Sequence, residues 1–431
     1  MRLTLFKTLL AVSAAGGLAA AGLAAAGPAL AGTVTPVACS SSALATAITG
    51  ASSGDTLQLA NCTYVLTTAL PDVTTTLTID GPATIERSLT GSPPAFSLLT
   101  VGSGGDLTTN KVSFTNGDAT TYGGAIYGED GPVTVQGGTF NGNNSGEYGG
   151  AIYNNDGLTV IGATFNQNGA TTYGGAIYNA DPALITGSTF TGNNGGEYGG
   201  ALYDDASVVA LNDTFTDNTT TVYGGAIEAD SGTTTVGLGN FFRNSSEYGG
   251  AILTDGGDLT VDRGYFTGNS AEYGGAIGNY DTAKLQNTTF TGNSATGEGG
   301  AIYTEDVMTI LTIAASHNSA PDGGAIYNDD TLTLDGGTLS SNTAAYGGGL
   351  DNEDLATVGT TTFQQNSASD EGGGIYNDDT LALNFATVTL NHAPSGGGIY
   401  NDGTTTLKGT QVKNNFINNC APAASVPGCI G

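Results

Sequence analysis

Pairs of adjacent glycines recur through most of this chain, and their spacing constrains the fold more than any other feature. Successive pairs are 24 to 26 residues apart, which is the length of one supersecondary unit in a solenoid. The twelve pairs begin at residues 123, 149, 174, 199, 224, 249, 274, 299, 323, 347, 372 and 396.

Each unit contains three short runs with β-strand propensity, separated by turns rich in Asn, Asp and Gly. In one unit these runs are residues 149–153, 158–161 and 163–165. Three such strands cannot bury an apolar face alone, but parallel pairing of each strand with its copy in the next unit closes a continuous interior. The sequence therefore predicts an all-β, single-stranded parallel β-helix of about 12 regular coils, preceded by less regular N-terminal coils.

Two apolar positions repeat with the glycines, and strand alternation places both inside the solenoid. The first is aliphatic in all twelve units: Ile126, Ile152, Ile177, Leu202, Ile227, Ile252, Ile277, Ile302, Ile326, Leu350, Ile375 and Ile399. The second is aromatic in nine units: Phe114, Phe140, Phe165, Phe190, Phe215, Phe241, Phe266, Phe290 and Phe363. We expect each set to stack as an internal column.

An asparagine column accompanies the apolar ones. Asparagine stands three residues after most of the phenylalanines, at 143, 168, 193, 218, 244, 269 and 293, and continues at 318, 342, 366, 391 and 415. Amides stacked at the strand spacing can bond to the copies above and below and to turn backbone groups. We interpret this column as structural rather than functional.

The charge of the chain argues against nucleic acid as a partner. The net charge is −30, from 39 acidic and nine basic side chains, and such a chain repels a phosphate backbone.

The first 31 residues have the pattern of an export signal. Arg2 and Lys7 precede a run of Ala, Leu and Gly that ends in the small-x-small sequence 29–31. The alternative is a membrane anchor, but Gly16, Gly22 and Pro28 interrupt the run. We predict a signal peptide over residues 1–31 and no membrane span after its cleavage.

All four cysteines lie near the ends of the predicted mature chain. In an exported protein, local pairing is favoured, of Cys39 with Cys62 and of Cys420 with Cys429. The alternative is buried free thiols.

The repeated pattern F-x-x-N followed by G-G-A-[IL], as in residues 190–202, resembles the repeat of the chlamydial polymorphic outer-membrane proteins. It spans residues 114–415. The resemblance implies a right-handed parallel β-helix with the fold of the pectate lyases, a secreted or cell-surface location, and a role as an adhesin.

Residues 38–70 resemble the N-terminal cap of secreted bacterial β-helix proteins. Ser41 or Ser42 can be the N-cap of a short helix that buries Leu44 and Ile48 over the first coil. We therefore predict four parts: a signal peptide (1–31), an N-terminal cap (32–70), the β-helix (71–415) and a disulfide-closed C-terminal cap (416–431).

Catalytic residues are not evident in the repeat. Pectate lyases use a basic residue beside calcium-binding carboxylates, but the three cations between the first and last glycine pairs, Arg243, Arg263 and Lys284, occupy different positions of their coils. We predict no catalytic residue.

Aspartates form a column in the turn after each glycine pair, where neighbouring carboxylates repel one another. Calcium ions between coils could screen them; the alternative is that Asp is a favoured turn residue and that salt screens it. The candidate calcium ligands are Asp130, Asp156, Asp181, Asp230, Asp281, Asp306, Asp330 and Asp379. No other cofactor is predicted.

Tyrosine follows the aliphatic position in eight units, and we expect it on the outer wall. Such a ladder can stack on sugar rings or anchor a protein; the alternative is a surface residue with β propensity. The candidate binding residues are Tyr127, Tyr153, Tyr178, Tyr203, Tyr303, Tyr327, Tyr376 and Tyr400.

The sequence thus favours a secreted or cell-surface repeat protein, non-enzymatic, that acts in adhesion or surface structure and contacts a polysaccharide or a cell-surface protein. Repetition favours extended binding, whereas catalysis usually interrupts a repeat at one cluster. The alternative is a carbohydrate-active enzyme, a lyase or hydrolase, or a polysaccharide-binding protein.

Overall fold

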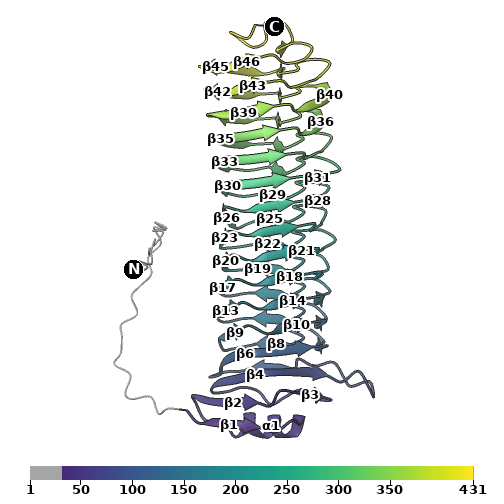
Figure 1. Ribbon diagram of the computed structural model, residues 1–431, viewed down its shortest axis with the longest axis vertical. Coiled ribbons are helices and arrows are strands. Elements are labelled where there is room, and N and C mark those ends of the chain that lie inside the picture. Colours follow the sequence, from purple (N-terminus) through teal and green to yellow (C-terminus); the bar gives the residue numbers. More distant parts are fainter. Residues whose placement is uncertain (1–31, 431) are drawn as a thin grey trace, which may run out of the picture. The chain divides into compact units, whose positions relative to one another are not determined.

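The computed structural model describes residues 32–430, which form a continuous parallel β-solenoid of about 16 turns (Figure 1). The predicted fold class is confirmed, and the turn count is only slightly higher than expected. The predicted signal peptide lies outside the described residues. Within residues 32–430, no helix is long and apolar enough to cross a membrane.

One wall of the solenoid is a 14-stranded sheet with one short strand from each coil. Its strands are β5 (Leu99–Val101), β8 (Ile126–Gly128), β12 (Ile152–Asn154), β16 (Ile177–Asn179), β19 (Leu202–Asp204), β22 (Ile227–Ala229), β25 (Ile252–Thr254), β29 (Ile277–Asn279), β32 (Ile302–Thr304), β34 (Ile326–Asn328), β37 (Leu350–Asn352), β41 (Ile375–Asn377), β44 (Ile399–Asn401) and β47 (Cys420–Ala421).

A 26-stranded sheet supplies the other strands of most coils. It contains β1 (Val34–Val37), β2 (Asp55–Leu59), β3 (Thr63–Leu66), β4 (Thr76–Arg87), β6 (Asp106–Thr115), β9 (Val133–Gln136), β10 (Thr139–Asn141), β13 (Leu158–Ile161), β14 (Thr164–Asn166), β17 (Ala183–Thr186), β18 (Thr189–Thr191), β20 (Ser207–Leu211), β21 (Thr214–Thr216), β23 (Thr233–Gly237), β24 (Asn240–Phe242), β26 (Asp258–Asp262), β27 (Tyr265–Thr267), β30 (Ala283–Thr291), β33 (Met308–Ser316), β35 (Thr331–Ser340), β38 (Leu355–Val358), β39 (Thr361–Gln364), β42 (Thr380–Asn384), β43 (Thr387–Thr389), β45 (Thr404–Lys408) and β46 (Gln411–Lys413).

Very short strands close some of the coils. They are β7 (Asp118–Ala119), β11 (Asn144–Ser145), β15 (Gly169–Ala170), β28 (Ser270–Ala271), β31 (Ser294–Ala295), β36 (Thr343–Tyr346) and β40 (Ser367–Glu371). All strand pairs run parallel and join equivalent residues of successive coils, so that Ile152 pairs with Ile126 on one side and Ile177 on the other. Equal positions of the repeat are therefore neighbours in space.

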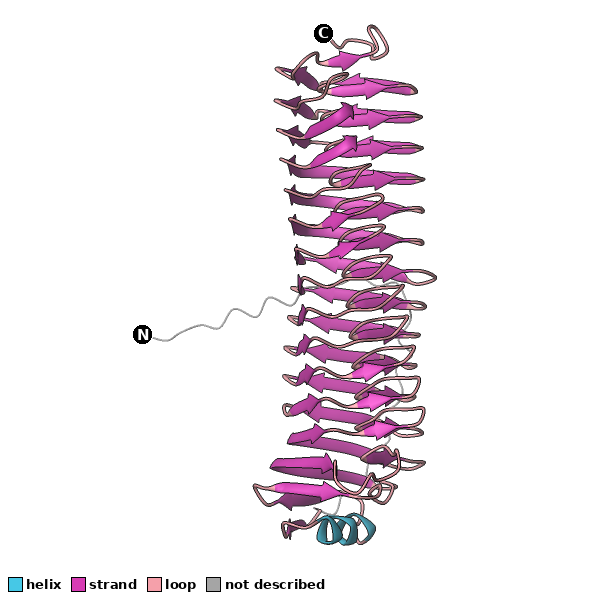
Figure 2. Cartoon of the chain, turned by 90° about the vertical axis from the view of Figure 1, so that its right-hand side faces the viewer, coloured by secondary structure: helices cyan, strands magenta, loops and turns pink. Residues whose placement is uncertain are grey.

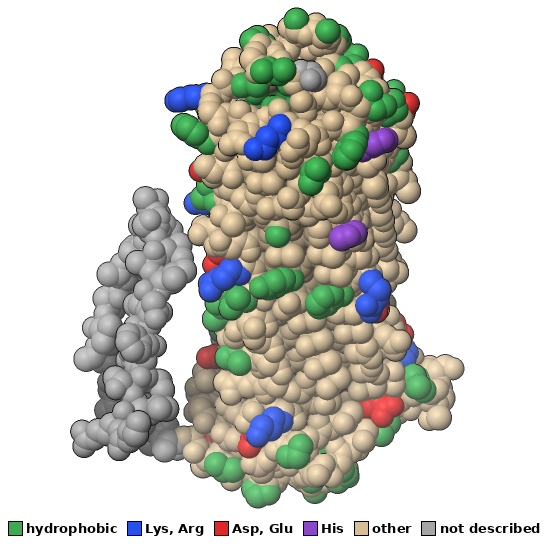
Figure 3. Space-filling view, turned by 45° about the horizontal axis from the view of Figure 1, so that its top comes forward, with side chains coloured by type: hydrophobic (Ala, Val, Ile, Leu, Met, Phe, Trp, Pro, Cys, Tyr) green, Lys and Arg blue, Asp and Glu red, His purple; other side chains and the backbone are tan. Residues whose placement is uncertain are grey.

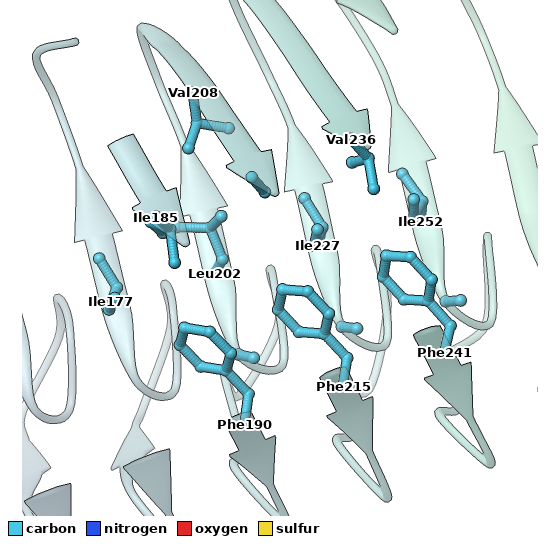
Figure 4. Close-up of a cluster of buried hydrophobic side chains, with 14 of the residues drawn as sticks. Ile177, Ile185, Phe190, Leu202, Val208, Phe215, Ile227, Val236, Phe241 and Ile252 are labelled. Atoms are coloured by element: carbon cyan, nitrogen blue, oxygen red, sulfur yellow. The ribbon is translucent and has the colours of Figure 1, made fainter. Parts of the chain in front are cut away.

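The two predicted apolar columns fill the interior. The aliphatic and phenylalanine positions are completely buried, and Figure 4 shows Phe190, Phe215 and Phe241 as parallel rings facing the aliphatic column. Adjacent phenylalanine rings stack with centroids 4.7 to 5.1 Å apart. Beyond Phe290, the column continues through Ala315 and Leu339 to Phe363.

The asparagine column is a continuous hydrogen-bonded ladder, as predicted. The Nδ2 of Asn168 donates to Asn193 Oδ1 at 3.0 Å and to the carbonyl of Phe140 at 3.0 Å. The backbone N–H of Asn168 donates to the same Asn193 oxygen at 3.0 Å. This pattern recurs from Asn143 to Asn391, so each buried amide bonds to the amide of the next coil and to a strand carbonyl.

The glycine pairs are explained by close backbone contact. Gly149 has φ 58°, and a Cβ there would collide with the carbonyl of Ile152. A Cβ on Gly150 would collide with the carbonyl of Gly175 in the next coil. Both positions therefore exclude a side chain.

A short helix covers the N-terminal end of the stack (Figure 2). Helix α1 (Ser41–Thr49) buries Leu44 and Ile48, as predicted, but its N-cap is Ser40 rather than Ser41 or Ser42. Disulfides join Cys39 to Cys62 and Cys420 to Cys429, which confirms the local pairing. The four-part division of the chain stays a prediction.

Candidate functional site

The eight predicted binding tyrosines, which we call the inner tyrosine row, lie along the 14-stranded sheet. Tyr153, Tyr178 and Tyr203 pair in register on β12, β16 and β19. The expectation that they form an exposed ladder is wrong: Tyr178 and Tyr203 are 9% and 6% exposed, and five of the other six are half-buried. Their role in binding stays a prediction.

Residues that interrupt the inner row are buried as well. We expected this position to be exposed and tolerant, but Glu228 and Asp351 are each 1% exposed and Leu253 is fully buried. At two positions of the inner row, a carboxyl group is therefore almost completely removed from solvent.

A second set of tyrosines, the outer tyrosine row, covers the inner row. Each member directly precedes a glycine pair: Tyr122, Tyr148, Tyr173, Tyr198, Tyr223, Tyr248, Tyr273 and Tyr346. The rings of Tyr148 and Tyr173 stack at 5.1 Å, and the ring of Tyr148 meets that of Tyr178 edge to face at 5.0 Å. This interleaving is why the inner row is not exposed. The two rows together are the tyrosine face.

Acidic residues of the turns accept hydrogen bonds from the tyrosine face. The hydroxyl of Tyr178 donates to Asp205 Oδ2 at 3.1 Å, and that of Tyr303 donates to Glu305 Oε2 at 3.2 Å. Burial, reinforced by the charge of Asp205, raises the pKa of Tyr178 far above its ordinary value. The phenols therefore remain hydrogen-bond donors at neutral pH.

The predicted calcium ligands lie in the turns, exposed or half-exposed. Several of them bond to the next residue: Asp156 accepts from the N–H of Gly157, and Asp330 accepts from the hydroxyl of Thr331. These bonds are typical of aspartate in turns. Residues 32–430 contain no group of three or more His, Cys, Asp or Glu side chains arranged to hold a metal ion. Calcium binding stays a prediction.

The sequence interpretation missed a buried polar row two residues after the aliphatic position. Asn154 donates to Asn179 Oδ1 at 3.0 Å, and Asn179 donates to Asp204 Oδ1 at 2.8 Å. Burial raises the pKa of Asp204 to about 6, although hydrogen bonds from Asn179 and Thr234 oppose the shift. The recurrence of Asn at this position, again at 328, 352, 377 and 401, is the signal that could have revealed it.

Acidic residues replace tyrosines of the two rows in adjacent coils, and a small cleft lies there, which we call the acidic cleft. It holds about 240 Å³ and is lined by Asp322, Tyr327, Tyr346, Asp351, Glu353 and Tyr376. Asp351 takes an inner-row position between Tyr327 and Tyr376. Asp322 takes an outer-row position between Glu298 and Tyr346.

The carboxyl groups of the acidic cleft hold protons more firmly than usual. Burial, and then the charge of Glu353, raises the pKa of Asp351 well above its ordinary value. Burial and the charge of Asp322 raise the pKa of the neighbouring Glu298 to about 7. Oδ1 of Asp351 accepts no hydrogen bond. The cleft thus concentrates incompletely solvated carboxyl groups beside aromatic rings.

Four segments of the chain match the model of the Chlamydia polymorphic membrane protein repeat: residues 162–180, 214–230, 287–305 and 360–378. Each matched segment extends from near the aromatic column into the following strand of the 14-stranded sheet. No curated protein sequence and no solved structure matches the chain.

The acidic cleft falls mainly between two of the matched segments. Residues 322–353 lie between the third and fourth matched segments, and only Tyr376 belongs to a matched one. The third and fourth matched segments thus flank most of the residues that line the cleft.

Basic side chains do not gather on the visible surface. Figure 3 shows Lys and Arg as separate spots on that face. The three ion pairs of the described residues are Arg87 with Asp118, Arg243 with Asp217, and Arg263 with Asp262. None of them includes a carboxyl group of the acidic cleft. The four matches to the repeat model and the parallel solenoid fit a surface repeat protein.

Proposed function

We propose that this protein acts at the cell surface or outside the cell as a non-enzymatic binding solenoid, in adhesion or surface structure, through its tyrosine face. The observation that carries the proposal is the interleaved packing of the two tyrosine rows over successive coils. A rigid, repeated aromatic surface offers a large contact area with little loss of side-chain entropy. The two disulfides and the predicted signal peptide support an extracellular location.

The partner we propose is a polysaccharide or a cell-surface protein. Partly exposed rings of the outer row can stack on sugar rings or receive apolar side chains. The carboxylates between them, such as Glu147 and Glu197, can accept hydrogen bonds from sugar hydroxyls. A polysaccharide that contacts many equivalent coils of the solenoid at once gains affinity by multivalency.

The test compares binding by the native chain with binding by a variant that lacks outer-row rings. Tyr148→Ala, Tyr173→Ala and Tyr198→Ala would be combined, and a glycan panel and intact cells would be screened. The matched control replaces exposed apolar residues of the 26-stranded sheet, Ile161, Leu184 and Val209, by Ala. We expect binding to fall in the tyrosine variant alone. Equal binding by both folded variants would contradict the proposal.

The alternative function is a carbohydrate-active enzyme. Its strongest candidate pair is Asp351 and Glu353, which both line the acidic cleft. That mechanism requires two carboxyl groups about 5 to 9.5 Å apart, on either side of the glycosidic bond. Reducing-end and unsaturated-product assays on acidic and neutral polysaccharides would decide between the two functions, because turnover would overthrow the non-enzymatic one.

A further inference from the structure

Asp351 is the most unusual side chain of the acidic cleft. It replaces a tyrosine on β37 and is 1% exposed, it lines the cleft, and its Oδ1 has no hydrogen-bond partner. A buried carboxyl oxygen without a partner is costly. A group that enters the cleft and donates to this oxygen would offset that cost.

The acidic cleft is surrounded by like charges. The titratable groups that face Asp351 and Glu353 from this coil and the adjoining coils are Glu298, Asp322, Asp329 and Asp378, with the phenols of Tyr327, Tyr346 and Tyr376. The ion pairs of residues 32–430 all lie elsewhere. The field in the cleft therefore favours a positive charge.

Aromatic rings form the remaining walls. Tyr346 is 38% exposed at the surface, and its ring meets that of Tyr376 edge to face at 5.6 Å. Rings beside carboxylates attract organic cations through the ring quadrupole. A metal ion instead needs several converging oxygen ligands, and the described residues provide no such group.

The size of the acidic cleft limits what can enter. Its volume of about 240 Å³ is below the roughly 300 to 1,000 Å³ of pockets that enclose whole small molecules. A single head group fits this space better than a sugar chain does.

From these observations we propose that the acidic cleft binds an organic cation, an alkylammonium or guanidinium head group, between the rings of Tyr346 and Tyr376 and the carboxyl groups of Asp322, Asp351 and Glu353. The head group donates to Asp351 Oδ1 and displaces the proton of that carboxyl group. Such a head group is present in small amines and in the Lys or Arg side chains of a partner protein. The proposal does not depend on the binding role of the tyrosine face.

The test is calorimetric titration of the full chain with n-butylammonium and with methylguanidinium chloride at constant ionic strength. We expect saturable binding by at least one of them, with proton release seen as an enthalpy that depends on the buffer. Asp351→Asn should weaken this binding about tenfold or more, because it removes a charged acceptor. Asp354→Asn, which removes an exposed charge from the same coil, should change it less than about twofold.

One further variant and a peptide ligand test the role of the aromatic ring and the source of the cation. Tyr346→Ala should also weaken binding severalfold, and a short Lys- or Arg-containing peptide that binds more tightly than the free head group would identify a protein as the source of the cation. Absence of saturable binding, equal losses in Asp351→Asn and Asp354→Asn, or tighter binding of calcium chloride than of either organic cation would overturn the proposal. Each result is independent of the glycan and cell screen, so the two proposals can fail separately.

Discussion

Tyr178 donates its hydroxyl hydrogen to Asp205 Oδ2, one coil further along the solenoid, at 3.1 Å. This bond joins two columns that the sequence presents as unrelated, the tyrosines after the aliphatic position and the aspartates of the turns. When a phenol donates a hydrogen bond to a carboxylate, part of the negative charge of the carboxylate is dispersed. Hydrogen bonds from the tyrosine face therefore reduce the electrostatic repulsion between the acidic turns of successive coils.

Calcium is not required by this arrangement of the turns. Because turn aspartates such as Asp156 and Asp306 bond to the following backbone N–H, we expect the thermal midpoint to be the same with and without a chelator. Scanning calorimetry of metal-stripped protein, with magnesium as the control ion, measures this. A midpoint that rises with calcium but not with magnesium would establish the calcium column instead.

The asparagine ladder should be a major source of stability. In Asn218→Ala, the N–H of Asn193 and the carbonyl of Phe190 lose their partner in the buried ladder. We expect the free energy of unfolding to fall by about 3 kcal/mol. The matched control is Asn144→Ala, at an exposed position, with a change below about 0.5 kcal/mol. Denaturant unfolding followed by circular dichroism gives both values, and similar losses in the two variants would contradict a special role for the ladder.

Buried carboxyl groups should make the solenoid less stable as the pH rises. Burial raises the pKa of Asp213 to about 7 and raises the pKa of Glu228 well above its ordinary value. The folded chain therefore holds protons that the unfolded chain has lost, and the free energy of unfolding falls from about pH 4 to beyond pH 7.

Glu228→Gln tests this dependence directly. The variant keeps the shape but cannot ionise, so it should be more stable than the native chain at about pH 8 and nearly equal to it at about pH 4. Glu272→Gln, at an exposed position, serves as the control, and melting curves across this range provide the measurement. A Glu228→Gln effect of equal size at both pH values would show that ionisation is not its cause.

The disulfide between Cys39 and Cys62 should hold the N-terminal cap on the first coils. It spans 23 residues, and a bridge that closes a loop of that length lowers the entropy of the unfolded chain and so stabilises the fold by about 3 kcal/mol. We expect the double Ser variant to melt at a lower temperature and its α1 amides to exchange faster. Loss of the Cys420–Cys429 bridge, which spans 9 residues, should have a slightly smaller effect. Unchanged exchange in α1 would show that the helix is held by packing alone.

The repeat in the sequence determined the path of the chain and the interior columns. In a parallel stack with constant register, equal positions become neighbours, so the spacing of Ile152, Phe165 and Asn168 was sufficient to predict the aliphatic, aromatic and amide columns. The local disulfides followed from the placement of the cysteines near the two ends.

Only the tertiary structure decided what lies on the outside. Strand alternation assigns Tyr178 to the outer side of its strand, but it does not show that Tyr148 and Tyr173 of the outer row fold back over that side. The acidic cleft around Asp351 likewise depends on how the bend before each glycine pair returns across the sheet. Burial of a side chain is set by every segment that packs on it, including segments from other coils, and for that reason a repeat predicts neighbours along a column more reliably than it predicts exposure.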